Sequence, residues 1–294
     1  MIIVRLLAVA FVGLAIIVFG GPPRAFAQAR GWSFGEGLTV ALHRAILACL
    51  GVRTRVHGAA SALTPQLVVV NHVSWLDIVV LGAMRRTEFL AKKEVGPPGI
   101  VGAAVSLQGV VFVDRGRRRL IPSVNAAMAR RMRAGAPMVL FAEATTGDGN
   151  RLMPFRSSHF EAIRQTLGQV GAEPKAAYVQ PLYLAYTRCG GLPVGRTGRP
   201  LVAWYGDMEF FSHLWSFLRA GRFDCEIWCG EVIAVDGVAD RKSIMTRVEA
   251  SVRSLAVKAF RDSAQSVPSD LPRLRSSPEA RKAVRWKTSQ RDRA

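Results

Sequence analysis

Cysteine is scarce in this sequence, and its spacing does not fit a metal site. The chain has 294 residues and four cysteines, which are Cys49, Cys189, Cys225 and Cys229. No pair has the spacing of a zinc finger or a zinc ribbon, and a chain of this length needs no disulfides to stabilise its core. We therefore expect unbridged core thiols in a reducing compartment, and no metal site.

Acidic residues are also few. The chain carries 21 Asp and Glu against 40 Lys and Arg, which gives a formal net charge of +19. Such an excess indicates a polyanionic partner, which is a nucleic acid, an anionic membrane surface or an acidic substrate. Because 50% of the residues are hydrophobic and the mean hydropathy is +0.19, a membrane surface fits better. We expect no nucleic-acid partner.

Several catalytic motifs are missing from the sequence. It contains no G-x-S-x-G nucleophile elbow, no Walker phosphate loop, no H-E-x-x-H zinc motif and no dinucleotide-binding fingerprint. Serine-hydrolase, P-loop, zinc-protease and Rossmann chemistry therefore have no support here.

The one long hydrophobic run lies at the N-terminus. Residues 2–21 are nearly all apolar, interrupted only by Arg5, and are just long enough to cross a bilayer core. The A-x-A at 25–27 resembles a signal-peptidase site, but the apolar run is long for a signal peptide. The arginines mostly follow the run, which keeps the rest of the chain in the cytoplasm. We expect 1–21 to be an uncleaved transmembrane or membrane-anchoring helix in the (inner) cell membrane.

Composition divides the remainder into three parts. Residues 22–60 form a linker with an interfacial or core helix at 38–50, which is too short to span a bilayer. Residues 61–261 form the main domain, and 262–294 are a basic tail that we expect to be disordered. Within the domain, the aromatic and arginine residues of 204–223 fit either a helix packed on the core or an interfacial element.

Strand-like and helix-like patterns alternate through the domain. Strands are expected at 67–70, 88–91, 110–114, 138–141, 178–186 and 226–233, and helices at 120–134, 157–167 and 242–261. This alternation predicts an α/β fold with a mixed, largely parallel sheet flanked by helices, in which ligands bind at the carboxyl ends of the strands. Pro181 within a strand predicts an edge or a bulge.

A His–Asp pair follows the first of these strands. His72 comes just after the strand and Asp77 five residues later; on a regular helix this offset rotates two side chains apart by about 140°. They meet only if the chain turns between them, with Asp77 on the next helix and Ser74 as its N-cap. Asp77 then orients one imidazole nitrogen and leaves the other free as a general base.

Three further blocks join strands to polar residues. An arginine at a strand's end suits bidentate recognition of a phosphate, and another strand ends in an acid and two hydroxyls. The residues that carry these blocks are Gly109 and Arg115, then Phe141, Glu143 and Thr145, then Val179 and Pro181.

In order and spacing, these blocks together with Asn71, His72 and Asp77 resemble the membrane glycerolipid acyltransferase family, of the lysophosphatidic-acid acyltransferase type. The resemblance implies that fold, and a direct transfer in which His72 deprotonates a lysolipid hydroxyl. The hydroxyl attacks the thioester of acyl carrier protein or coenzyme A, a co-substrate, and no acyl-enzyme, metal or cofactor is required. It also implies a substrate-binding set of Arg115, Glu143, Thr145, Gly109 and Asn71.

The third block departs from the family pattern. Ala142 stands where the family usually has Pro, Ala144 where it has Gly, and Thr146 where many members have Arg. The block looks like the branch that includes lyso-ornithine-lipid acyltransferases. The sequence thus predicts conversion of 1-acyl-glycerol-3-phosphate to phosphatidic acid, with lyso-ornithine-lipid O-acylation as the alternative. A non-catalytic basic lipid-binding membrane protein is a further alternative, and the acyl donor and chain length stay open.

Overall fold

A computed structural model describes residues 3–5, 7–8, 11, 34–92, 110–113, 118–167 and 176–265. Most of the expected anchor and tail lie outside these residues, as do Gly109 and Arg115. The strands are β1 (Val52–His57), β2 (Gln66–Val70), β3 (Glu88–Lys92), β4 (Val110–Val113), β5 (Met138–Phe141), β6 (Ala177–Cys189), β7 (Leu192–Pro193), β8 (Phe223–Cys229) and β9 (Ile233–Val235). The helices are α3 (Phe34–Leu50), α4 (Leu76–Met84), α6 (Ile121–Arg133), α7 (Glu161–Arg164), α8 (Phe210–Ala220) and α9 (Arg241–Gln265). Short 3-10 turns are η3 (Arg118–Leu120), η4 (Ser157–Phe160) and η5 (Arg199–Leu201).

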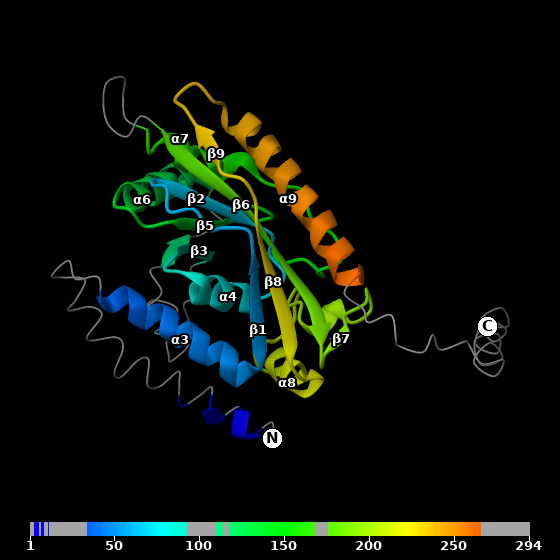
Figure 1. The fold of residues 1–294 in the computed structure, drawn as a ribbon. Helices are drawn as coiled ribbons and strands as arrows, with labels where there is room; N and C mark the ends of the chain where they lie inside the picture. Colours follow the sequence, from blue (N-terminus) through cyan, green and yellow to red (C-terminus); the bar gives the residue numbers. More distant parts are fainter. Residues whose placement is uncertain are drawn as a thin grey trace.

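The strands form one mixed sheet in the order β1-β8-β6-β2-β5-β3-β4, with β7 and β9 also paired to β6 (Figure 1). The strands from β6 to β4 run parallel to one another, whereas β8, β7 and β9 are antiparallel to β6. The prediction of a mixed, largely parallel sheet flanked by helices is confirmed.

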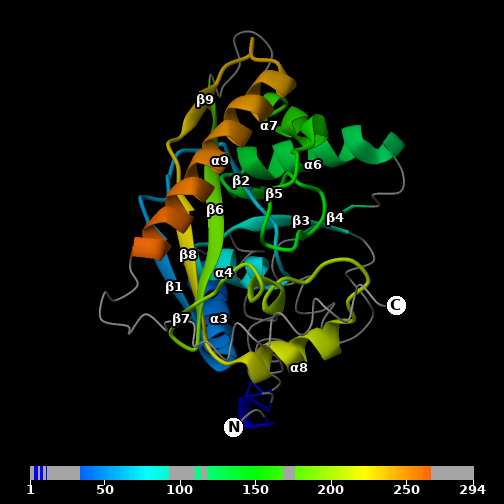
Figure 2. The same ribbon diagram turned by 90° about the vertical axis from the view of Figure 1, so that its right-hand side faces the viewer.

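Both faces of the sheet are covered because the central strands are apolar on both sides. In β2, Val68 and Val70 pack into a core with α3, α4 and α8. Leu67 and Val69 point to the other face, where α6, α7 and α9 pack (Figures 1 and 2). All four side chains are almost fully buried. Because β2 is packed on both faces, its position in the sheet is rigid. A functional group at its carboxyl end is therefore held in a fixed position.

The strands differ from the expectation in two ways. β1, an edge strand paired with β8, was not among the expected strands. Its polar-rich pattern, with only Val52 buried, hid it. The single strand expected at 226–233 is two strands, because β8 ends at Cys229 and β9 begins only at Ile233.

Pro181 does not lie on an edge, because β6 is interior and pairs with β2 there. On its other side, β9 pairs up to Val179 and β8 only from Leu182. The proline falls in the gap between these two partners, where no ladder donor is required, and its carbonyl accepts a hydrogen bond from Gly230 N at 2.8 Å.

The observed helices lie close to the ranges predicted for them. α6 and α9 match the patterns at 120–134 and 242–261, and the helix expected at 157–167 is shorter, formed by η4 and α7. α3 is a core helix with buried Leu47, Leu50 and His43. A Cβ on Gly82 of α4 would lie 2.6 Å from His43 Nε2, so the glycine permits the two helices to approach closely. His43 is thus a packing residue between α3 and α4.

The residues of α8 divide between core and surface. Leu214 and Phe217 belong to the core, whereas Phe211 is 67% exposed and Trp215 43% exposed. The core-packed interpretation is therefore confirmed for one face. The other face is exposed and carries two aromatic side chains beside Ser212, Ser216 and Arg219. Within the residues that the structure describes, no helix combines the length and the apolar character needed to cross a bilayer.

Candidate active site

The polar residues of the first and third blocks leave the sheet side by side. β2 and β5 are parallel neighbours, and their last residues, Val70 and Phe141, are paired in register. The loops that begin at Asn71 and Ala142 therefore start at the same carboxyl edge, where parallel sheets place their ligands.

His72 and Asp77 meet as the sequence predicts. Asp77 lies in the first turn of α4, and its Oδ2 is 2.8 Å from His72 Nδ1. The Asp77 side chain is fully buried, whereas 16% of the His72 side chain is exposed. The imidazole stacks on Phe141, with ring centroids 3.9 Å apart and planes 17° from parallel. The ring is thus fixed at its Nδ1 edge and on one face.

The surroundings of Asp77 define the imidazole tautomer. Oδ2 also accepts backbone hydrogen bonds from Val73 N (2.7 Å) and Ser74 N (2.9 Å). An oxygen that accepts from two N–H groups is an acceptor toward His72 as well, so the proton lies on Nδ1. Nε2 then carries the lone pair that a general base needs.

The prediction that Ser74 caps α4 is wrong. Trp75 is the N-cap residue, no side chain caps it, and Ser74 Oγ has no hydrogen-bond partner among the described residues. The carboxylate of Asp77 binds the Val73 and Ser74 amides instead, which closes the loop around the histidine.

Tyr186 of β6 is a site residue that the sequence analysis missed. Its buried hydroxyl donates a 2.8 Å hydrogen bond to Asp77 Oδ1, and it also contacts the Cys225 thiol. Burial, followed by the negative charge of Asp77, raises the pKa of Tyr186 well above its usual value, so the hydroxyl remains a donor. The signal lay in the two-residue alternation of β6, which puts Leu182, Leu184 and Tyr186 on one face.

Glu143 holds the histidine loop from the opposite side. Its Oε1 accepts from His72 N and its Oε2 from Met153 N, both at 2.9 Å. Burial, partly offset by these two backbone donors, raises the pKa of Glu143 to about 7. Both oxygens are engaged with the backbone, which gives Glu143 a positioning role in this structure. Its expected contact with the substrate stays a prediction.

Asn71 is likewise engaged with the backbone. Its amide nitrogen donates to Leu184 O at 3.0 Å and its amide oxygen accepts from Leu184 N at 2.8 Å. The side chain is buried and fastens the end of β2 to β6. It therefore supports the position of His72, and its assignment to substrate binding stays a prediction.

Ala144 and Thr145 of the third block are exposed to solvent. Thr145 is exposed, and Ala144 before it has φ 63°, in the left-handed region. The glycine usual at this position in the resembled family adopts such a backbone without strain. Gly109 and Arg115 fall in the part of the chain that is not described, so their roles stay predictions.

In chemical terms the site presents an oriented base. All four cysteines are free thiols. No group of three or more potential metal ligands occurs within the described ranges. His72 Nε2 makes no hydrogen bond to another described residue, so it is available to a bound hydroxyl.

Comparisons with known proteins agree with this geometry. A family model described as "Acyltransferase" matches residues 53–185. A lyso-ornithine lipid O-acyltransferase of Brucella abortus is 42% identical over 218 residues, 74% of this chain and 81% of the relative. One from Rhizobium meliloti is 35% identical over 251 residues, 80% of this chain and 85% of the relative.

More distant relatives have another name. A 1-acyl-sn-glycerol-3-phosphate acyltransferase of Neisseria meningitidis is 29% identical over 221 residues, 74% of this chain and 79% of the relative. The crystal structure of the 1-acyl-sn-glycerophosphate (LPA) acyltransferase PlsC from Thermotoga maritima superimposes with a TM-score of 0.63 at 16% identity. The superposition covers 87% of this chain and 95% of the Thermotoga maritima chain, and it supports the fold.

The non-catalytic alternative does not fit relatives that are enzymes and a His–Asp pair that is intact. The chain belongs to the acyltransferase family and is a lysolipid O-acyltransferase.

Proposed function

We propose that the protein is a lyso-ornithine lipid O-acyltransferase, which uses acyl carrier protein or coenzyme A thioesters as donors. The observation that carries this proposal is the difference in identity between the two kinds of relative, 42% and 35% against 29%. Thr146, in place of the arginine that many glycerol-phosphate enzymes have, supports the same acceptor. The acceptor that the sequence predicted first, 1-acyl-glycerol-3-phosphate, becomes the second candidate.

The reaction follows from the free nitrogen of His72. Nε2 takes the proton of the acceptor hydroxyl as its oxygen attacks the thioester carbonyl, forming the new C–O bond. The tetrahedral intermediate collapses, the C–S bond breaks, and the imidazolium returns its proton to the leaving thiolate. Asp77 stabilises the imidazolium between these two steps, because its buried carboxylate binds Nδ1–H.

The framework around His72 contributes by preorganisation. The Asn71 amide, the Glu143 carboxylate and the Asp77 carboxylate each hold the backbone of this loop or of the strand beside it. Such a base is already oriented before the acceptor binds, so little reorganisation is required during proton transfer.

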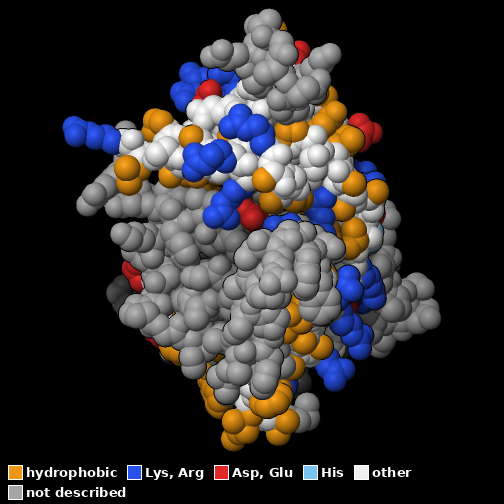
Figure 3. Space-filling model, turned by 90° about the vertical axis from the view of Figure 1, so that its left-hand side faces the viewer, with side chains coloured by type: hydrophobic (Ala, Val, Ile, Leu, Met, Phe, Trp, Pro, Cys, Tyr) orange, Lys and Arg blue, Asp and Glu red, His pale blue; other side chains and the backbone are white. Residues whose placement is uncertain are grey.

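We further propose that the enzyme works at the cytoplasmic face of the cell membrane. Arg5 donates to the carbonyls of Leu50 and Leu218, near the ends of α3 and α8, and thereby joins the N-terminal segment to α8. Hydrophobic side chains gather at the lower end of the molecule in Figure 3, the end at which Figures 1 and 2 place α8 and the N-terminus. Exposed Phe211 and Trp215 suit the depth of lipid head groups.

The acceptor assignment is tested by competition. Purified protein in detergent is given an acyl-carrier-protein thioester with equal amounts of lyso-ornithine lipid and 1-acyl-glycerol-3-phosphate, and the two products are quantified. We expect the ornithine product to exceed the phosphate product about tenfold or more. A head group whose charges do not match the site binds less tightly, and a loss of about 1.4 kcal/mol corresponds to this tenfold preference.

Two results would redirect the assignment. A preference for 1-acyl-glycerol-3-phosphate would replace the proposed acceptor with the second candidate. Transfer to neither acceptor with either donor type would contradict both.

A further inference from the structure

Arg199 is a cation beside the active site that the proposed chemistry does not yet use. It begins η5, shortly after β6 and β7, and the same segment is tied to the histidine loop by a 2.9 Å bond from Trp204 N to Val73 O. Gly149 completes the contact: a Cβ there would lie 3.3 Å from Val73 Cγ1 and 3.6 Å from Arg199 Cβ. Gly149 therefore lies close to both Arg199 and Val73, the residue that follows His72.

The guanidinium lacks a strong partner. Its carbon lies 3.9 Å from the centre of the Phe260 ring, and Nη1 makes a long 3.4 Å bond to Asn150 Oδ1. Nε is buried without a hydrogen-bond partner, and no carboxylate among the described residues forms an ion pair with Arg199. Burial, the largest effect, lowers the pKa of Arg199 because it disfavours the charged form. A partly buried, unpaired guanidinium is costly unless an anion occupies the site.

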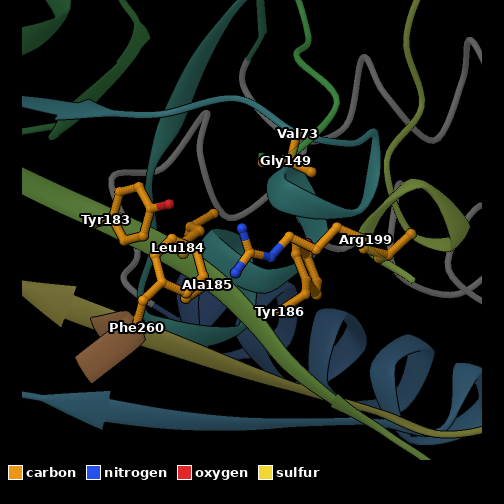
Figure 4. A pocket seen from close by; sticks show the side chains of 9 residues that line it. Val73, Gly149, Tyr183, Leu184, Ala185, Tyr186, Arg199 and Phe260 are labelled. Carbon is orange, nitrogen blue, oxygen red and sulfur yellow. The ribbon is translucent and has the colours of Figure 1, made fainter. Parts of the chain in front are cut away.

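A pocket opens in front of this group. Val73, Gly149, Tyr183, Arg199 and Phe260 line it, together with Leu184, Ala185, Tyr186 and Val202. In Figure 4 the Arg199 side chain extends into the pocket, and the Tyr183 hydroxyl points toward it from β6. Burial, the largest effect, raises the pKa of Tyr183, so its hydroxyl is a neutral donor. The pocket thus offers two hydrogen-bond donors, the Arg199 guanidinium and the Tyr183 hydroxyl, on an otherwise apolar wall. Its lining includes Val73, the residue after His72.

The charge of the pocket selects the class of anion. Arg199 is the charged side chain that lines the pocket; the Arg196 guanidinium adds positive charge from outside the lining, and Asp148, on the loop beside Gly149, opposes it. One guanidinium suits a monoanionic carboxylate, bound through two parallel N–H groups. A phosphate monoester, with up to two negative charges, would meet the Asp148 carboxylate. An ornithine head group carries a carboxylate and an ammonium, and so fits both signs.

We propose that Arg199, assisted by the Tyr183 hydroxyl, binds the carboxylate of the acceptor's head group and thereby determines acceptor specificity. This inference rests on the proposed function. The subsite places the head group on one side of the His72 loop, and the acceptor hydroxyl is then brought to Nε2 from a fixed anchor.

The test compares acceptors that differ only in the carboxylate. kcat and KM are measured for wild type, Arg199→Gln and Arg247→Gln with lyso-ornithine lipid and with its methyl ester. Arg247 is exposed on α9 and does not line the pocket, so its variant is a control matched in charge.

In wild type we expect the ester to have a KM about tenfold above the acid. Arg199→Gln should raise the KM for the acid by about the same factor, leave kcat within about threefold, and no longer distinguish acid from ester. Arg247→Gln should behave as wild type. If Arg199→Gln does not fold, Arg199→Lys, which keeps the charge but not the fork, should still raise the KM for the acid alone.

Three outcomes overturn the inference: equal effects on acid and ester, an unchanged acceptor KM, or a raised donor KM, which would assign Arg199 to the phosphate of the donor. Equilibrium binding of acid and ester to the inert His72→Ala variant separates this inference from the proposed function. A preference for the acid that depends on Arg199 supports the subsite even if no acyl transfer to that lipid occurs. Lack of such a preference contradicts the subsite even if transfer occurs.

Discussion

The loops that follow β2 and β5 leave the same edge of the sheet but are built differently. In the β2 loop, Asn71 has both amide groups paired, and the Asp77 carboxylate accepts four hydrogen bonds. In the β5 loop, Ala144 has a left-handed backbone and Thr145 is exposed. The β2 loop, which we propose moves the proton, is fully hydrogen-bonded without substrate, whereas the β5 loop, which we propose meets the acceptor, is exposed at Ala144 and Thr145. We expect changes in the first loop to alter kcat, and changes near the second to alter acceptor use or stability.

Asp77→Asn is expected to have the greatest effect of the variants that keep the side-chain shape. The amide cannot both accept from three N–H groups and stabilise an imidazolium, so kcat should fall on the order of 10³-fold or more. Steady-state rates on folded protein measure this. A loss below about tenfold would show that Asp77 does not orient the base.

Tyr186→Phe removes one donor to Asp77 while leaving the packing intact. A hydrogen bond to a charged group contributes roughly 1.5 to 3 kcal/mol, so kcat should fall about tenfold, with acceptor KM unchanged. Tyr178→Phe, on the same strand, is the matched control and should keep the wild-type kcat. A kcat for Tyr186→Phe within about twofold of wild type would reduce Tyr186 to a packing residue.

Glu143→Gln tests the buried carboxylate through stability. The pKa of Glu143 is raised from 4.5 to about 7, so the folded state binds the proton more tightly than the unfolded state. The free energy of unfolding of wild type, relative to the variant, should therefore fall as pH rises from about 4.5 to about 7, by on the order of 2 to 3 kcal/mol. Urea titrations at several pH values measure it, with exposed Glu231→Gln as control. A relative stability that rises over this window would contradict the raised pKa.

Ala144→Gly is expected to have the smallest effect. Relief of the left-handed alanine, set against the added freedom of the unfolded chain, should stabilise the protein by about 0.5 kcal/mol and raise Tm by one or two degrees. Gly135→Ala, at φ 88° with nothing within 4 Å of its Cβ, is the reciprocal variant and should lower Tm. A lower Tm for Ala144→Gly would show that the alanine methyl contributes more than its backbone costs.

Local patterns in the sequence predicted the parts that depend on neighbours along the chain. The apolar run before Asn71, the turn between His72 and Asp77, and the alternation of strands and helices all have short-range signals. The parts that were missed depend on pairing between distant segments. β1 is recognisable only through its pairing with β8, and Pro181 is tolerated only because β8 and β9 divide the same side of β6.

Within the site, the same division applies. Tyr186 hydrogen-bonds Asp77 across 109 residues of sequence, and the segment that contains Arg199 meets the histidine loop through the bond from Trp204 N to Val73 O. Glu143 was recognised by its block, but the resemblance alone did not reveal that both of its oxygens bind backbone amides. A motif identifies which residue matters, whereas the surrounding contacts decide what it does.

The central claim is that His72 is the base of the transfer. The most direct measurement is the single-turnover rate of acyl transfer to lyso-ornithine lipid by His72→Ala, beside wild type and His57→Ala, which removes a half-exposed histidine on edge strand β1. We expect a loss on the order of 10³-fold or more in His72→Ala, with acceptor binding retained, and little change in His57→Ala. A rate in His72→Ala within about tenfold of wild type would contradict it.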